Sequence, residues 1–138
     1  MHSIIDGDTI TVTVQSQTVT VRLLGIDTPE KRGGPRPAEC FGAEATAFIA
    51  GLIPVGTAVD LSRDEETRDQ YGRTLAWVHR HDGVLVNLAM VESGHASSLF
   101  FTPNDAHEDL FDRAAWGARR SGRGFWAACG GPDVALAP

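Results

Sequence analysis

Four short segments carry acidic and basic side chains of the kinds that bind metal ions and phosphate groups. Alone, each is a weak signal, because an Asp-Gly-Asp stretch is more often a turn that opens a strand. Together they supply several carboxylates and two guanidinium groups, and this combination is more specific. The segments are Asp6-Gly7-Asp8-Thr9, Arg22-Leu23-Leu24, Asp27-Thr28-Pro29-Glu30 and Asp69-Gln70-Tyr71-Gly72-Arg73.

Two of the carboxylates are expected to meet at one end of a β-hairpin. Residues 9–14 and 18–24 alternate polar and apolar side chains around a polar turn at 15–17, which predicts two paired strands. Asp8 precedes the first strand and Asp27 follows the second, so antiparallel pairing brings the two side chains together. Carboxylates, a loop carbonyl and water are the oxygen ligands that calcium prefers. The histidine and cysteine set typical of zinc is not found in these segments.

The two arginines and Glu30 complete the groups needed to hydrolyse a phosphodiester. Arg22 and Arg73 offer planar guanidinium groups that bind phosphate oxygens in pairs. Glu30 follows Asp27 by three residues, so the Thr28-Pro29 turn is expected to hold it near the metal, where it can orient or deprotonate water. A metal, two arginines and a carboxylate stabilise charge and activate water in a displacement at phosphorus.

The remaining chain predicts a small barrel with helices. Apolar residues at helical spacing indicate helices over 41–52, over 87–91 with Asn87 as its cap, and from 104 or 105 to about 122. Further strands are predicted at 57–62, 74–80 and 84–86, and 31–38 forms an irregular loop. We therefore expect an α+β fold, a five-stranded β-barrel of the OB type with three α-helices.

Length and composition predict one domain with a single core. The chain has 138 residues, of which 42% are hydrophobic, and residues 1–129 are expected to form the domain. Residues 130–138 are small and poor in large apolar side chains, which predicts a flexible C-terminal tail. No apolar run is long enough for a membrane span. The net charge of −6 argues against tight clamping of a long duplex, because such proteins are usually basic.

The motifs resemble those of the staphylococcal nuclease-like (thermonuclease) family. They occur in the same order from residue 4 to about residue 126, which is nearly the whole chain: DGDT, RLLGIDTPE, CFGAEA, DQYGR, NLAMVESGHA and TPNDAHE. The resemblance implies a five-stranded OB barrel with three helices. It also implies calcium-dependent, sugar-non-specific hydrolysis of DNA and RNA that leaves 3′-phosphate ends.

The same resemblance implies roles for residues at matching positions. Asp8 and Asp27 would be carboxylate ligands of Ca²⁺, and Thr28 would contribute its backbone carbonyl. Arg22 and Arg73 would hold the scissile phosphate. DNA and RNA, in single-stranded or denatured form, are then the expected substrates, and the protein is expected to be a monomer without a membrane partner.

Glu30 would act on the attacking water, either as a general base or by orienting it, and Tyr71 would contact a terminal phosphate of the nucleotide. The chain also departs from the family pattern. Gln70 replaces a lysine, and Leu99 and Phe101 replace tyrosines of the base pocket. Because leucine cannot stack on a base as an aromatic ring can, weaker substrate binding is expected.

Cys40 and Cys129 are too far apart in sequence for a Cys-x-x-Cys metal site, and the residues alone allow two free thiols or one disulfide. Similar folds pack the C-terminal segment near the first helix, so the resemblance favours the disulfide. A disulfide implies an oxidising compartment. We expect a secreted or extracytoplasmic protein whose leader is not part of this chain, since residues 1–10 lack signal-peptide features.

A nucleic-acid-binding OB module without catalysis is the alternative, because barrels of this type often bind single strands. Such a module has no need for paired carboxylates beside a water-activating glutamate. The five residues that catalysis requires are all present, which favours the enzyme: Asp8, Arg22, Asp27, Glu30 and Arg73.

Overall fold

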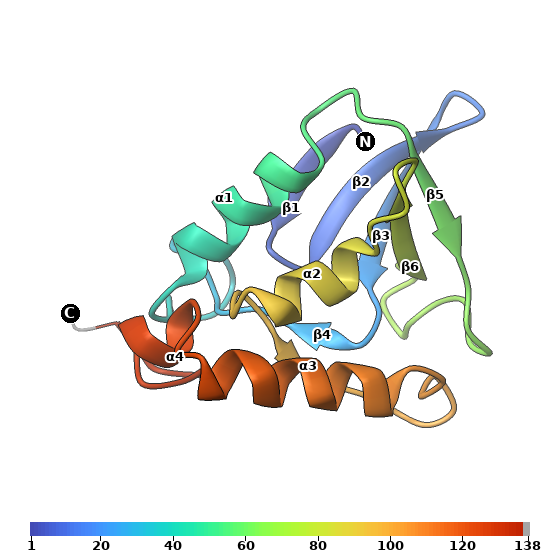
Figure 1. Cartoon of the computed structure of the whole chain (residues 1–138). Coiled ribbons are helices and arrows are strands. Elements are labelled where there is room, and N and C mark those ends of the chain that lie inside the picture. The colour runs from blue at the N-terminus through green and yellow to red at the C-terminus, as the bar shows by residue number, and fades with distance from the viewer. Residues whose placement is uncertain (137–138) are drawn as a thin grey trace.

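The main sheet has five strands in the order β1-β2-β3-β6-β5, in a computed structural model that describes residues 1–136 (Figure 1). These residues also contain a two-stranded sheet, β4-β7, and four helices. The strands are β1 (Ser3–Asp6), β2 (Thr9–Val14), β3 (Gln17–Leu23), β4 (Ile26–Asp27), β5 (Val59–Ser62), β6 (Thr74–Arg80) and β7 (Ser97–Ser98). The helices are α1 (Gly42–Leu52), α2 (Val86–Glu92), α3 (Glu108–Arg120) and α4 (Phe125–Ala128).

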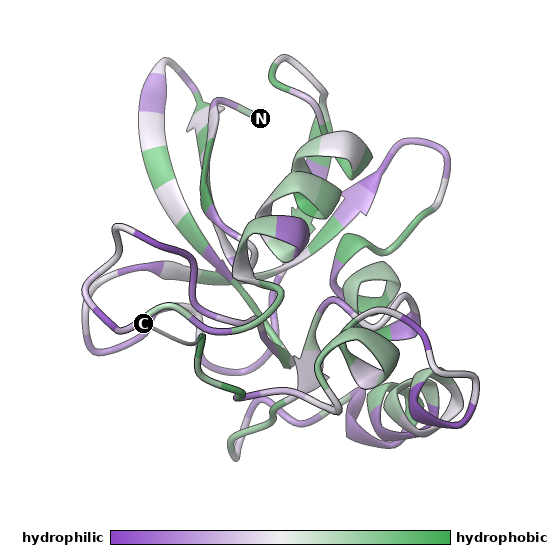
Figure 2. Ribbon diagram, turned by 90° about the vertical axis from the view of Figure 1, so that its left-hand side faces the viewer, coloured by the Kyte–Doolittle hydropathy of each residue, from purple (hydrophilic) through white to green (hydrophobic). Residues whose placement is uncertain are grey.

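The predicted hairpin is formed by β2 and β3, with Thr9 opposite Arg22 and Val14 opposite Gln17. Its strands alternate hydrophilic and hydrophobic residues along their length (Figure 2). On its other side β3 pairs in parallel with β6, and Arg22 lies opposite Leu75. The parallel pairing matters for the site because it brings the start of β6, and the loop before it, beside Arg22.

A single core fills the space between the main sheet and the helices. The side chains of Ile10 and Leu23 from the hairpin are fully buried, as are Ile49 of α1, Met90 of α2 and Phe111 of α3. Each such side chain contributes about 1.5–3 kcal/mol relative to an exposed one. In Figure 1, α3 lies along the base of the molecule below β4, and its C-terminal end reaches α4.

The predicted α+β class agrees with the structure, but the closed barrel is not confirmed. The sheet order leaves β1 and β5 at its two edges. The predicted strand at 84–86 is wrong: Leu85 makes one isolated bridge to His79, and Val86 already begins α2. The fifth strand is β1 instead, which pairs with β2.

Two details of the helices also differ from prediction. Residues 1–136 contain a fourth, short helix, α4, in addition to the three predicted. Asn87 does not cap α2; it is buried within the helix and links β6 to Leu24, the residue after β3. Its amide donates to the carbonyls of Leu24 (2.9 Å) and Ala76 (3.1 Å), and its oxygen accepts from the Val78 amide (2.8 Å).

The C-terminal segment lies against the loop before α1. The Cys40 amide donates to the Val134 carbonyl (2.7 Å), and the Leu136 amide donates to the Ala38 carbonyl (3.1 Å). The flexibility predicted for 130–138 stays a prediction, and 137–138 lie outside the described residues. No helix within 1–136 is long and apolar enough to span a membrane.

Candidate active site

Asp8 is the buried centre of the candidate site. Its side chain is held by hydrogen bonds from the Thr28 amide (3.2 Å) and the Thr9 hydroxyl (3.0 Å), and an Arg22 guanidinium nitrogen lies 3.4 Å from it. Burial by itself would raise the pKa of Asp8, but the Arg22 charge and these hydrogen bonds outweigh it and lower the pKa. Asp8 is therefore a fixed carboxylate.

A glycine allows the two acidic segments to approach each other. A Cβ on Gly7 would lie 2.8–2.9 Å from the Thr28 side chain, closer than side-chain carbons are found. The turn between β1 and β2 can therefore pack directly on the Thr28 segment. This contact places Asp8 beside Asp27 and Thr28, the predicted ligand set.

Two further carboxyl groups lie close enough to Asp8 to feel its charge. Burial and the charge of Asp8 raise the pKa of Asp6 to about 7. The same two causes, in the same order, raise the pKa of Asp27 to about 6. Carboxylates that repel one another in a partly buried site create a negative potential that favours binding of a cation.

Glu30 lies beside this acidic cluster, and hydrogen bonds to Glu39 fix its backbone. The Glu30 amide donates to a carboxylate oxygen of Glu39 (2.9 Å), and the Glu39 amide donates to the Glu30 carbonyl (2.8 Å). The Arg36 guanidinium lies 3.8 Å from the Glu30 carboxylate. Burial, then the charge of Asp8, raises the pKa of Glu30, which makes this carboxylate a better proton acceptor than an ordinary glutamate.

Gly42 makes the position of Glu30 possible. A Cβ at this first residue of α1 would lie 2.1 Å from the Glu30 carbonyl oxygen, which is a direct clash with the backbone. The start of α1 therefore packs against the backbone of Glu30, and any larger residue would displace one of them.

Arg73 is held by its neighbours in the loop before β6. Asp69 accepts from the Arg73 side chain (2.7 Å) and, through its other oxygen, from the backbone amides of Tyr71 and Arg73 (2.9 Å each). The Arg73 guanidinium lies 5.4 Å from the centroid of the Tyr71 ring, which is 73% exposed. The loop thus presents a guanidinium and an aromatic ring together.

Arg22 and Arg73 line one pocket of about 380 Å³. Tyr71, Leu99 and Phe101 also line it, so the positions predicted to form the base pocket lie beside the two arginines. An open pocket lined by two guanidinium groups and by exposed apolar side chains suits a nucleotide, which has a phosphate and a base.

The groups that could hold a metal are oxygen donors. Asp8 and Asp27 lie together, and Thr28 is bound to Asp8 through its amide. Within residues 1–136, no group of three or more histidine, cysteine or acidic side chains is arranged to hold a metal ion. A cation here would therefore take two carboxylates and complete its shell with carbonyl and water oxygens. Such a shell fits Ca²⁺, which accepts irregular oxygen coordination.

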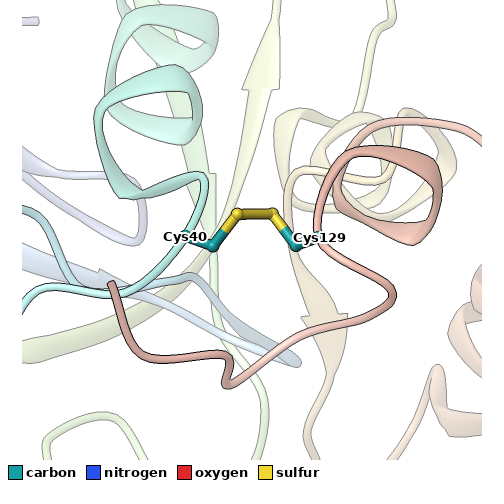
Figure 3. The surroundings of a disulfide bond; sticks show 2 residues. All are labelled: Cys40 and Cys129. Carbon is teal, nitrogen blue, oxygen red and sulfur yellow. A yellow bond between two sulfur atoms is a disulfide. The ribbon is translucent and has the colours of Figure 1, made fainter. Parts of the chain in front are cut away.

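The two cysteines form a disulfide, as expected. Cys40 and Cys129 are joined across 89 residues of sequence, with their Cα atoms 6.0 Å apart (Figure 3). The bond links the segment before α1 to the segment after α4. Because Glu39 precedes Cys40, the disulfide also braces the loop that holds Glu30.

Three acidic residues of the site were not assigned by the sequence. Asp6 was part of a recognised motif, and its burial beside Asp8 gave no local signal. Asp69 could have been found, because an aspartate two residues before Tyr71 and four before Arg73 is typical of a side chain that caps a turn. Glu39 had no such signal, since its contact with Glu30 depends on the path of the loop.

Comparison with known proteins identifies the family of the chain. The family model described as "Staphylococcal nuclease homologue" matches residues 20–128. A thermonuclease of Staphylococcus intermedius is 35% identical over 123 residues, covering 89% of this chain and 72% of that protein. A thermonuclease of Staphylococcus hyicus is 31% identical, covering 90% and 72%. Endonuclease YhcR of Bacillus subtilis is 30% identical over 89% of this chain, which corresponds to 11% of that much longer protein.

The relatives place this small α+β domain among nucleases. The chain belongs to the staphylococcal nuclease family, because the family model covers most of its length and the two thermonucleases match it nearly from end to end.

Proposed function

We propose that this protein is a calcium-dependent nuclease that hydrolyses phosphodiester bonds of both DNA and RNA and leaves 3′-phosphate ends. The observation that carries the proposal is the meeting of an acidic cluster and two arginines at one end of the sheet. Asp8 and Asp27 provide the negative site, and Arg22 contacts Asp8 while also lining the pocket that Arg73 shares.

The residues divide the work of the reaction in this proposal. Arg22 and Arg73 bind the oxygens of the scissile phosphate and stabilise the extra negative charge of the transition state. Glu30 accepts a proton from the attacking water or orients it, and its raised pKa makes it a stronger base than an ordinary glutamate. Bound Ca²⁺, held by Asp8, Asp27 and the Thr28 carbonyl, would supply Lewis-acid stabilisation of the phosphoryl charge.

The substrate-binding part of the proposal rests on the pocket. Tyr71 is exposed at its mouth and would contact a terminal phosphate, while Leu99 and Phe101 would cover a base. Unpaired bases are needed to enter such a pocket, so single-stranded or denatured nucleic acid is the preferred substrate. The disulfide fits an oxidising, extracytoplasmic compartment, which we also propose.

The test is cleavage of denatured DNA and of RNA in calcium, in magnesium and in EDTA. Acid-soluble product should form in calcium and not in EDTA. A 3′-phosphatase should release inorganic phosphate from the ends of this product. No cleavage of either polymer in calcium by the folded protein, with binding retained, would reject the enzyme in favour of a binding module.

A further inference from the structure

Helix α3 and the segment that follows it, up to α4, carry a second group of positive and aromatic side chains, outside the candidate active site. We call it the α3 arginine patch. No acidic residue occurs between Asp112 and Asp133, although the whole chain has a net charge of −6. The patch therefore concentrates positive charge on an otherwise acidic protein. It consists of Arg113, Trp116, Arg119, Arg120, Arg123 and Trp126.

Arg119 lies between two indole rings. Its guanidinium carbon is 5.9 Å from the centroid of the Trp116 ring and 5.6 Å from that of Trp126, within the range of cation–π attraction. Trp116 is 57% exposed. Arg120 follows Trp116 by four residues and so shares its face of the helix. The patch thus presents an aromatic surface and guanidinium groups side by side.

The arginines of the patch have no acidic partner within residues 1–136. Arg113 donates to the backbone carbonyl of Asp109 (3.3 Å), and Arg123 donates to that of Glu92 (3.1 Å). Arg119 contacts the two indoles, and Arg120 is exposed. Because carbonyl groups are neutral, these contacts leave the positive charges free to bind an anion.

The patch is connected to the candidate site through one helix. The Ser98 hydroxyl donates to the Asp112 carboxylate (2.7 Å), and β7, which contains Ser98, pairs with β4, which contains Asp27. Arg119 is seven residues after Asp112, which is about 10 Å along the helix axis. Figure 1 shows α3 passing below β4 and ending beside α4. Arg119 and Arg120 therefore lie about two turns of α3 beyond the residue that contacts β7.

We propose that the α3 arginine patch is a second, non-catalytic binding site for single-stranded nucleic acid. The guanidinium groups bind backbone phosphates, and the exposed face of Trp116 stacks on an unpaired base. The inference rests on the proposed function for the class of substrate, and it adds where the strand lies beyond the catalytic pocket.

The geometry favours a single strand over other anionic partners. A duplex keeps its bases stacked, so it offers no base to Trp116. An anionic membrane surface would need an apolar helix face flanked by basic residues. A broad membrane surface would also meet Glu108 and Asp109 in the first turn of α3, which repel it, whereas a narrow single strand can contact the patch without lying over these side chains.

The test is binding of a short labelled oligothymidylate in EDTA. Fluorescence anisotropy measures the binding over a range of salt concentrations. Arg119→Ser/Arg120→Ser should raise Kd by roughly 10-fold or more at low salt and reduce the salt slope by about 1.4, the value for two phosphate contacts on a single strand. The control is Arg63→Glu, which changes net charge equally at an exposed position and should leave Kd within about two-fold of the parent.

Substitutions of Trp116 test the stacking of a base separately from the binding of phosphates. Trp116→Ala should weaken binding by at least about 5-fold, whereas Trp116→Phe, which keeps a ring, should retain most of the affinity. Equal affinity of the double arginine variant and the parent would overturn the proposal. So would tighter binding of the parent to vesicles of anionic phospholipid than to oligothymidylate.

Binding in EDTA needs no catalysis, so the two proposals can fail separately. The patch variants should hydrolyse a p-nitrophenyl ester of thymidine phosphate, which has one base and no continuing strand, at the parent's rate, while their KM for long single strands rises. If the parent cleaves neither substrate but shows the binding pattern above, the proposed function fails and the patch stands.

Discussion

Asp8 is surrounded by acidic side chains, and this crowding has a consequence for stability. Burial and the charge of Asp8 raise the pKa of Asp6 to about 7 and that of Asp27 to about 6, from an ordinary value of 3.8. Without a cation, the folded protein binds these protons more tightly than the unfolded chain does. The stability they contribute is complete below pH 3.8 and is lost as pH rises through 6 and 7.

We therefore expect Asp6→Asn to remove part of this pH dependence. In EDTA, the free energy of unfolding decreases between pH 4 and pH 7. This decrease should be about 1–3 kcal/mol smaller for Asp6→Asn than for the parent. Urea denaturation at a series of pH values measures the difference. Asp60→Asn, at an exposed position of β5, is the control and should follow the parent. Parallel curves for Asp6→Asn and the parent would show that Asp6 titrates normally.

The base pocket gives a second prediction at the scale of single residues. Leu99 lies in the pocket with Arg22 and Arg73 but cannot stack on a base. Leu99→Tyr should strengthen binding by about 1–3 kcal/mol, seen as a lower KM for single-stranded DNA at similar kcat. Val55→Tyr adds the same ring at an exposed position outside this pocket and should leave KM unchanged. An unchanged KM for Leu99→Tyr would mean that no base occupies this part of the pocket.

At the scale of elements, the start of α1 fixes the position of Glu30. Gly42→Ala should lower the free energy of unfolding by about 1–3 kcal/mol, because its Cβ would clash with the Glu30 carbonyl, and it should also reduce kcat. Gly51→Ala is the matched control in the same helix, where nothing lies near the new Cβ. It should be neutral or stabilising by up to about 1 kcal/mol. Urea denaturation and initial rates test both variants, and full activity of Gly42→Ala would contradict the account.

Local patterns predicted the elements that carry their own signal. The hairpin of β2 and β3 has period-two alternation over whole strands, and α1 has apolar residues at helical spacing, so both were found within one or two residues. Strands β1, β4 and β7 are only two to four residues long and too short to show a period. They exist because a neighbouring strand pairs with them.

The contacts within the candidate site were likewise predictable only where a local sequence pattern determines them. The meeting of Asp8 with Asp27 follows from the hairpin. The meeting of Arg22 with Arg73 depends on the parallel pairing of β3 with β6, and no local pattern encodes which strands pair across 50 residues. The contact between Glu39 and Glu30 depends on a loop without regular structure. The sequence therefore identified the residue types of the site, but it did not predict the contacts that depend on distant strand pairing or on an irregular loop.

At the scale of the whole molecule, the disulfide joins the segment before α1 to the segment after α4. Cys40→Ser/Cys129→Ser should lower the free energy of unfolding by about 2–5 kcal/mol, because the bond closes a loop of 89 residues in the unfolded chain. Urea denaturation of the variant, and of the parent with a reductant, should give the same lower midpoint. A midpoint equal to that of the oxidised parent would show that the bond does not form in solution.

Two regions of opposite charge matter for the proposals. The acidic cluster at Asp8 is the proposed cation site, and the α3 arginine patch is the proposed site for phosphates. A net charge of −6 is compatible with a nucleic-acid substrate because local charge, more than the total, decides where a polyanion binds.

The central claim is that Glu30 and bound calcium together drive phosphodiester hydrolysis. The most direct measurement is the initial rate of acid-soluble product from denatured DNA, for the parent, Glu30→Gln and Glu44→Gln, in calcium and in EDTA. Glu44 lies in the first turn of α1 and is exposed, so it is a matched control.

We expect Glu30→Gln to lower the rate in calcium by about 10²- to 10⁴-fold. Its circular dichroism spectrum and calcium affinity should stay those of the parent. Glu44→Gln should keep the parent's rate, and all three proteins should be inactive in EDTA. A Glu30→Gln variant that cleaves at the parent's rate, or cleavage that persists in EDTA, would contradict the account.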